Sequence, residues 1–251
     1  MQKDFYPMIF KRKSFHLFRN VGNANINAAE LKEIEDTWES FERLCPDIKT
    51  AMRIVPAQKV NFRRDAEYCI MLYSEEKENY LMNMGYLGEQ LDLFLVSHNI
   101  GTLWFGIGKP DEKAYNGLSY VIMIAIHKIA DESLFRKNMF KAKRKPLDEI
   151  WSGDTLGIAE IARFSPSACN TQPWHVKHEA DTLTVSRYKK LGKRGIMPTA
   201  AITYYNRIDI GIFLCILEIC MAENGIAFSR ELFPDTGDMH AEYTKVAVYT
   251  V

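Results

Sequence analysis

Polar side chains are concentrated in residues 165–174 of this chain. Two prolines restrict the backbone near both ends of the segment. Between them, Ser167, Asn170, Thr171 and Gln172 supply closely spaced hydrogen-bond donors and acceptors. None of these residues is a strong base or a charged nucleophile. We therefore expect the segment to hydrogen-bond a flat polar heterocycle rather than to break a bond itself.

Basic residues gather in two other segments. Arg12, Lys13 and His16 surround Ser14, and a guanidinium fork suits a phosphate group because it makes paired, charge-assisted bonds. Residues 141–146 are a second basic run. Taken alone, either run is more typical of a solvated basic surface than of a phosphate site.

Residues 100–106 combine glycine, threonine and aromatic residues. Gly106 would allow close approach of the backbone to a ligand, and Trp104 and Phe105 offer flat apolar surface. The alternative interpretation of this segment is a helix C-cap followed by a buried strand.

Together these segments resemble the FMN-dependent nitroreductase family. The most specific match is Pro-Ser-x-x-Asn-x-Gln-Pro-Trp at 166–174, supported by Gly-Thr-x-Trp-x-Gly at 101–106 and Arg-x-Ser at 12–14. The resemblance implies an α+β, nitroreductase-like fold, bound FMN, and NAD(P)H as reductant. It implies cofactor contacts at Arg12, Lys13, Ser14, His16, Leu103, Trp104, Phe105, Gly106, Lys143, Arg144, Pro166, Ser167, Ala168, Asn170 and Gln172.

The resemblance also implies a role for each of these groups. Arg12, Ser14 and Arg144 would bind the FMN phosphate, and the backbone N–H of Gly106 would point at flavin N5. The loop at 166–172 would hold the ring. No side chain is required as an essential acid or base, because the cofactor carries the electron chemistry.

The order of the segments differs from that of ordinary family members, in which the polar loop follows the basic motif by a few dozen residues. Here the loop occurs only in the second half. Members of the family are homodimers that bind FMN between subunits, so the chain resembles a fused pair in which each half kept part of one site. Asn99 and Asn224, which both end apolar helices, lie 125 residues apart (224 − 99) in a chain of 251. We predict two diverged repeats, 1–150 and 151–251, that form an intrachain pseudo-dimer with one FMN per chain.

His16 departs from the family pattern, because most relatives carry Arg or Lys near flavin N1 and O2. A permanent cation there stabilises the negative charge of the reduced flavin, whereas histidine does so only when protonated. We therefore expect the flavin to be harder to reduce at alkaline pH than in typical relatives.

Composition excludes several classes of protein. Thirty-two basic and thirty-two acidic residues cancel, so no overall field attracts nucleic acid or a membrane surface. The apolar run at 208–221 is interrupted by Asp209 and Glu218, for which we expect solvent-facing or first-turn positions. Five cysteines without a Cys-x-x-Cys pair indicate reduced thiols and a cytoplasmic protein. Cys169 has two interpretations, a reactive thiol or, as we favour, small packing beneath the flavin edge.

Hydrophobic periodicity predicts the main elements. Asn27 and Glu30 have capping-box spacing ahead of a helix that buries one face. Apolar patterns then predict strands at 68–73, 120–126 and 182–188, and helices at 85–98, at 155–164 and from about 208 to 224.

We expect an oxidoreductase that transfers a hydride from NAD(P)H to a nitroaromatic, a quinone or a similar small acceptor. The alternatives are a flavin-binding protein without turnover and a cofactor-free relic of the same fold. No third ligand is spaced to complete a metal site with His175 and His178, so we predict none. The patterns leave open the physiological acceptor, the choice between NADH and NADPH, and whether the chain is a monomer or a homodimer.

Overall fold

The structure is a computed structural model that describes residues 5–61, 64–189, 197–238 and 240–251. It has the mixed α+β content expected from the sequence. The helices are α1 (Tyr6–Lys11), α2 (Ala28–Trp38), α3 (Tyr80–Ser97), α4 (Leu147–Ile150), α5 (Ala159–Ala162) and α6 (Thr199–Glu223). Short 3-10 turns are η2 (Ala57–Lys59), η3 (Glu132–Leu134), η4 (Met139–Lys141) and η5 (Ala168–Asn170). The strands are β1 (Thr50–Pro56), β2 (Tyr68–Ser74), β3 (Ile100–Trp104), β4 (Ala114–Tyr115), β5 (Leu118–Lys128), β6 (Trp151–Ser152), β7 (Trp174–Glu179), β8 (Thr182–Tyr188), β9 (Ser229–Leu232) and β10 (Tyr243–Thr250).

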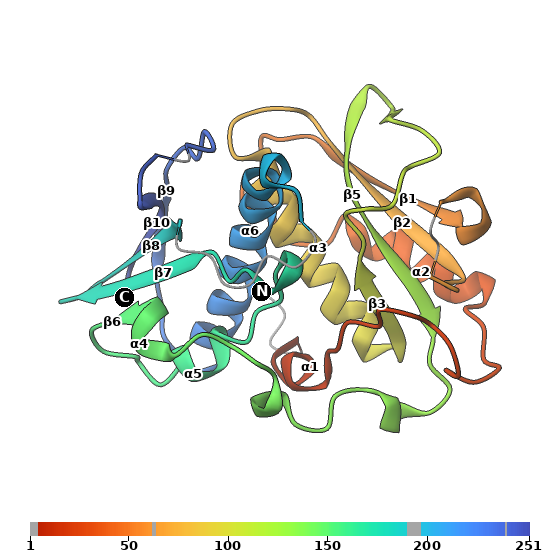
Figure 1. The fold of residues 1–251 in the computed structure, drawn as a ribbon, viewed down its shortest axis with the longest axis horizontal. Coiled ribbons are helices and arrows are strands. Elements are labelled where there is room, and N and C mark those ends of the chain that lie inside the picture. The colour runs from red at the N-terminus through yellow and green to blue at the C-terminus, as the bar shows by residue number, and fades with distance from the viewer. Residues whose placement is uncertain (1–4, 62–63, 190–196, 239) are drawn as a thin grey trace.

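The strands form two sheets, and α3 and α6 lie between them (Figure 1). The first sheet has the order β1-β2-β5-β3, with β4 paired to β5, and all of its pairs are antiparallel. The second has the order β6-β7-β8-β10-β9, in which only the β6–β7 pair is parallel. Strands of the first sheet come from residues 50–128 and those of the second from 151–250.

Helices α3 and α6 touch backbone to backbone at two glycines. A Cβ atom added to Gly85 would lie 2.0 Å from the carbonyl oxygen of Ile208, and one added to Gly211 would lie 1.9 Å from that of Met82. Because only glycine permits such close approach, these two positions set the helix separation. Both helices are buried almost throughout, and they join the two sheets in one continuous hydrophobic core.

Strand β5 is buried on both faces, as the sequence predicts. Ile122, Ile124 and Ile126 point into the core shared with α3 and α6, whereas Met123 and Ala125 point into a second cluster behind the sheet. Successive strand residues point to opposite faces, so a continuous apolar run serves both cores.

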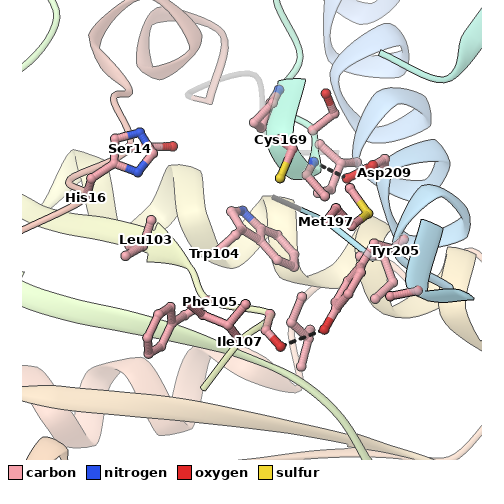
Figure 2. A pocket seen from close by; sticks show the side chains of 18 of the residues that line it. Ser14, His16, Leu103, Trp104, Phe105, Ile107, Cys169, Met197, Tyr205 and Asp209 are labelled. Atoms are coloured by element: carbon pink, nitrogen blue, oxygen red, sulfur yellow. Dashed lines mark hydrogen bonds between the residues drawn. The ribbon is translucent and has the colours of Figure 1, made fainter. Parts of the chain in front are cut away.

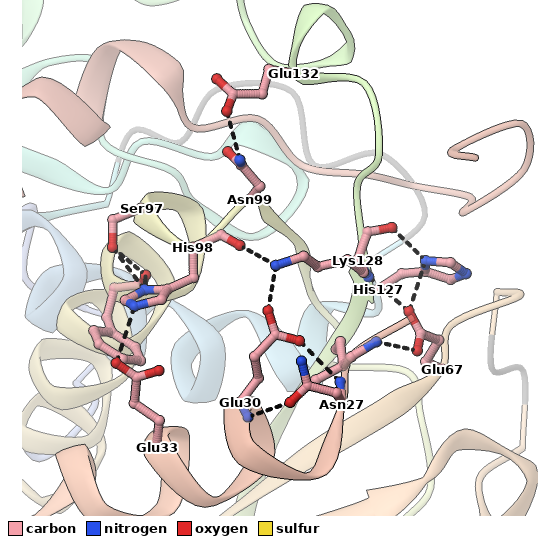
Figure 3. Close-up of polar contacts among 12 residues, drawn as sticks. Asn27, Glu30, Glu33, Glu67, Ser97, His98, Asn99, His127, Lys128 and Glu132 are labelled. Atoms are coloured by element: carbon pink, nitrogen blue, oxygen red, sulfur yellow. Dashed lines mark hydrogen bonds and ion pairs between the residues drawn. The ribbon is translucent and has the colours of Figure 1, made fainter. Parts of the chain in front are cut away.

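The predicted capping box at the start of α2 is present. Asn27 accepts a hydrogen bond from the backbone N–H of Glu30, and the Glu30 carboxylate accepts one from the N–H of Asn27. Figure 3 shows the hydrogen bonds between the same region and β5. Lys128 Nζ donates to Glu30 Oε1 (2.5 Å) and to the carbonyl of His98 (2.8 Å). Glu67 accepts hydrogen bonds from the N–H groups of Ile26 and Lys128, both at 2.8 Å. These contacts tie α2 and the end of α3 to the first sheet.

Three predicted helices have different bounds in the structure, and one of them, predicted at 85–98, is α3 at Tyr80–Ser97. Only Ala159–Ala162 is helical within 155–164, because Leu156 and Gly157 have left-handed backbones (φ 51° and 70°) that delay the start of the helix. Helix α6 begins at Thr199, about nine residues before the apolar run. Its first turns are rich in polar and small residues, so they carry no continuous apolar signal.

Glu218 is not solvent-facing, contrary to the expectation from sequence. Its side chain is buried among the tyrosines of both halves of the chain, where it accepts hydrogen bonds from Tyr86 Oη (2.7 Å) and Tyr249 Oη (2.6 Å). Arg230 donates to the same carboxylate. A buried carboxylate is tolerated here because every oxygen has a donor and a cation is adjacent.

All five cysteines are free thiols in the structure. Within the described ranges, no group of three His, Cys, Asp or Glu side chains is arranged to hold a metal ion. None of the helices in this part of the chain is both long and apolar enough to cross a membrane.

Candidate functional site

A cavity of ≈ 550 Å³ lies where the N-terminal segment, the end of β3, the polar loop at 165–172 and helix α6 meet (Figure 2). It brings together residues from all three of the most specific sequence motifs. The described residues that line it are Arg12, Ser14, His16, Arg64, Leu103, Trp104, Phe105, Gly106, Ile107, Ile122, Pro166, Ser167, Ala168, Cys169, Met197, Pro198, Ala201, Tyr205, Ile208, Asp209 and Ile212.

Arg12 is buried at one end of this cavity and is held by an acidic pair on α3. Its Nε donates to Asp92 Oδ2 at 2.7 Å, and Glu89 Oε1 lies 3.7 Å away. Asp92 also accepts from Thr102 Oγ1 (2.5 Å) and Trp104 Nε1 (2.9 Å). Burial raises the pKa of Glu89 well above its usual value, although the charge of Arg12 opposes this shift. The Nη2 atom of Arg12 is buried and has no partner among the described residues.

The residues after Arg12 run beside strand β3. Ser14 forms a parallel bridge with Thr102, and the Phe15 N–H donates to the Thr102 carbonyl at 2.9 Å. This pairing places Ser14 and the exposed His16 on the cavity wall. Lys13 points elsewhere, since its Nζ donates to the Leu134 carbonyl (2.5 Å), and it is absent from the lining.

The end of β3 supplies the floor of the cavity through residues 103–106. The carbonyl of Gly106 accepts a hydrogen bond from Tyr205 Oη at 2.6 Å, and a Cβ atom added to Gly106 would lie 2.6 Å from the Tyr205 ring. Its N–H donates to no residue in the described part of the chain. Glycine is therefore required at this position by the aromatic ring of α6, and the position offers an unused backbone donor.

The polar loop has an unusual backbone. Cys169, Asn170 and Gln172 all have positive φ (49°, 58° and 48°), a conformation that costs free energy in residues other than glycine. Residues 166–169 line the cavity, with the thiol of Cys169 on its wall. The surrounding structure must hold the loop in this shape.

Asn170 and Gln172 are outside the cavity lining and brace the loop instead. Asn170 accepts from Arg144 Nη1 (3.1 Å) and donates to the Lys143 carbonyl (3.1 Å). Gln172 accepts from the N–H of Lys145 at 2.8 Å. One part of the loop thus lines the cavity, and the other part fixes the loop to residues 143–145.

Two arginines beside the cavity are short of anionic partners. Burial, reinforced by neighbouring arginines, lowers the pKa of Arg136 and of Arg144 to about 10 each. Arg12 contributes to both shifts. Arg144 uses Nη2 to bind the Phe164 carbonyl (2.9 Å), and its Nε is buried without a partner among the described residues. Neither side chain lines the cavity itself, and Arg136 was not recognised from sequence because it belongs to none of the motifs.

Asp209 corrects a second expectation, because it is buried in the cavity wall rather than exposed to solvent. Burial raises its pKa to about 8, although hydrogen bonds from Ala168 and Thr171 oppose the shift. Tyr205 was also missed by sequence reasoning. A signal was present nonetheless: the lining residues of α6 recur at helical spacing, namely Ala201, Tyr205, Ile208, Asp209 and Ile212.

The chain is similar to known proteins in sequence and in fold. The model of the family described as "Putative TM nitroreductase" matches residues 4–221. A putative nitroreductase from Thermotoga maritima superposes with a TM-score of 0.62 at 18% identity, covering 98% of this chain and 93% of its own. A nitroreductase family protein from Clostridium difficile (TM-score 0.48, 12% identity) covers 62% of this chain and 99% of its own. A putative nitroreductase in complex with FMN from Desulfovibrio desulfuricans (TM-score 0.41, 13% identity) covers 59% of this chain and 95% of its own. No curated protein matches the chain.

Proposed function

Because this chain belongs to the putative TM nitroreductase family, we propose that it is an FMN-dependent oxidoreductase with one FMN per chain in the cavity between its two halves. When bound, FMN would supply the redox chemistry, taking a hydride from NAD(P)H and reducing a small acceptor such as a nitroaromatic compound or a quinone. The protein's part is to bind and orient the reactants and to exclude water.

One observation carries this proposal: residues 12–16, 103–106 and 166–169, which are distant in sequence, meet around a single cavity of ≈ 550 Å³. A site of this kind, largely apolar with a few convergent polar groups, is the usual form of a cofactor or substrate site.

The polar groups at one end of the cavity fit a phosphate. Arg12 Nη2 is a buried donor with no partner in the described part of the chain, and Arg136 and Arg144 carry charges that disfavour one another. An anion among these three guanidinium groups would satisfy the donor and relieve the repulsion. Ser14 stands on the adjoining wall.

The rest of the cavity fits a flat ring system. Leu103, Trp104 and Phe105 supply apolar surface, and the unused N–H of Gly106 can donate to a ring nitrogen. The loop at 166–168 closes the opposite side. Lys13, Lys143, Asn170 and Gln172 would act indirectly, by holding these walls in place.

The visible absorbance spectrum of the purified protein, recorded before and after anaerobic addition of NAD(P)H, tests the proposal. We expect a flavin spectrum that bleaches on addition of NAD(P)H. A flavin that stays oxidised would favour the alternative of a flavin-binding protein without turnover. A colourless protein that also fails to bind added FMN would leave a cofactor-free relic of the fold.

His16→Arg should change how the reduction potential of the bound flavin depends on pH. His16 lines the cavity and is exposed. The charge of an imidazole in general depends on pH in the physiological range, whereas a guanidinium is always charged. Between about pH 6 and 9 we expect the potential of the wild type to fall more steeply than that of the variant, by up to about 30 mV per pH unit for a two-electron couple. Spectroelectrochemical titration measures this, and identical slopes would contradict the role of His16.

A further inference from the structure

Asp209 connects helix α6 to the polar loop. Its Oδ1 accepts a hydrogen bond from the Ala168 N–H at 2.9 Å, and its Oδ2 lies 3.4 Å from Thr171 Oγ1. Only 3% of the residue is exposed, and it stands in the wall of the cavity (Figure 2). Ala168 and Thr171 flank the left-handed residues Cys169 and Asn170, so these two contacts hold the strained part of the loop.

The hydrogen-bonding pattern fits a protonated Asp209. Thr171 has one hydroxyl hydrogen, and its nearer acceptor is Asn206 Oδ1 at 3.1 Å. A hydrogen used there leaves a lone pair of Thr171 Oγ1 facing Asp209 Oδ2. A proton on Oδ2 would complete a chain in which Asp209 donates to Thr171 and Thr171 donates to Asn206.

The surroundings of Asp209 provide no ion-pair partner within the described part of the chain. Burial is the first cause of its raised pKa, which is about 8, and only the Ala168 and Thr171 contacts oppose it. Arg12 of the N-terminal segment is in direct contact with Asp92 and Glu89 of α3. The titratable or charged residues that face the same cavity or lie beside it are Arg12, His16, Arg64, Glu89, Asp92, Arg136, Arg144, Cys169 and Tyr205.

We propose that Asp209 is a positioning residue that holds the polar loop against α6 as a neutral carboxylic acid, and that ionisation of this group loosens the loop wall of the cavity. The link to ligand affinity rests on the proposed function, since it assumes that FMN occupies the cavity. Ligand binding removes further water from Asp209 and so favours the neutral form, which makes binding proton-linked.

The first test needs no cofactor. Asp209→Asn mimics the neutral acid, because its amide can donate to Thr171 and accept from Ala168. An unfolded Asp ionises near pH 4, so between about pH 5 and 8 unfolding of the wild type releases a proton. Relative to Asp209→Asn, the unfolding equilibrium constant of the wild type should rise about tenfold per pH unit in this range and then level off. Glu223→Gln, an exposed change on the same helix, keeps Asp209, so its unfolding equilibrium constant should change with pH in parallel with that of the wild type.

Denaturant unfolding curves at several pH values, with infrared spectra of the folded proteins, decide the proposal. We expect the protonated-carboxyl absorption of the wild type to be reduced, but not abolished, in Asp209→Asn, because burial also raises the pKa of Glu89. Parallel pH profiles for these two proteins, or equal protonated-carboxyl absorption in both, would overturn the proposal. If Asp209→Asn does not fold, Thr171→Val and Thr171→Ser replace it: the carboxyl band should shift in the valine variant only, and equal bands would overturn the proposal.

Titration with FMN tests the linkage to the cavity. From about pH 6.5 to 9, the dissociation constant of the wild type should rise about tenfold more than that of Asp209→Asn. Equal changes would overturn the link between Asp209 and the ligand. Failure of the wild type to bind FMN at any pH would instead overturn the proposed function, and the unfolding and infrared results would still decide whether Asp209 is neutral.

Discussion

Arg12→Ala should destabilise the fold by about 3–5 kcal/mol at neutral pH, the usual cost of removing one partner of a buried ion pair. Asp92 would lose its 2.7 Å contact with Nε, and Glu89 its only nearby cation among the described residues. Both carboxyls would remain buried in α3. Urea unfolding at pH 7 measures the loss.

Arg12→Lys is the matched control, because it keeps the charge but loses the guanidinium fork. We expect it to recover much of the stability lost in Arg12→Ala. Its affinity for FMN should remain low, because the buried Nη2 donor is gone. Unfolding curves for the alanine variant that match the wild type would show that Arg12 does not compensate the acidic pair.

Gly211→Ala should destabilise the protein by about 3 kcal/mol or more, at the upper end of the range for overpacked cores. The new Cβ would lie 1.9 Å from the Met82 carbonyl oxygen and 2.8 Å from the Tyr86 nitrogen, so neither contact can be relieved by rotating a side chain. Helices α3 and α6 would have to separate along their buried length. Thermal and urea unfolding measure this effect.

The expected sign opposes ordinary helix propensity, which favours alanine over glycine by about 1 kcal/mol. Ala222→Gly near the end of the same helix serves as control and should cost no more than about that amount. A Gly211→Ala protein as stable as the wild type would mean that the two helices are not held at the separation described above.

Elements with a single clear pattern were predicted well from sequence. The strand at 182–188 has the same bounds in the structure, and the capping box at Asn27 and Glu30 is present. Strands β1, β9 and β10 were not predicted, because none of them has a continuous buried apolar run like that of β5. The start of α6 was missed because residues that line a cavity need not be apolar. The division into repeats 1–150 and 151–251 stays a prediction.

The site was predicted in part. The motifs indicated which segments meet, and His16, Gly106 and Ser167 do lie on one cavity. Local spacing does not reveal which side chains of a loop face inward, so the positions of Asn170 and Gln172 required three-dimensional information. Asp209 was misplaced because charged residues in apolar helices usually face water, and only tertiary contacts reveal a buried one.

The glycine contact between α3 and α6 also constrains how this protein can change over evolutionary time. Gly85 meets the backbone near Ile208, and Gly211 meets the backbone near Met82, so each half of the chain supplies the space that the other needs. A larger residue at either glycine can be accepted only after the opposite helix shifts. The effect of a mutation in one half therefore depends on the sequence of the other half. A half acquired from a distant relative would not pack against the half that remained.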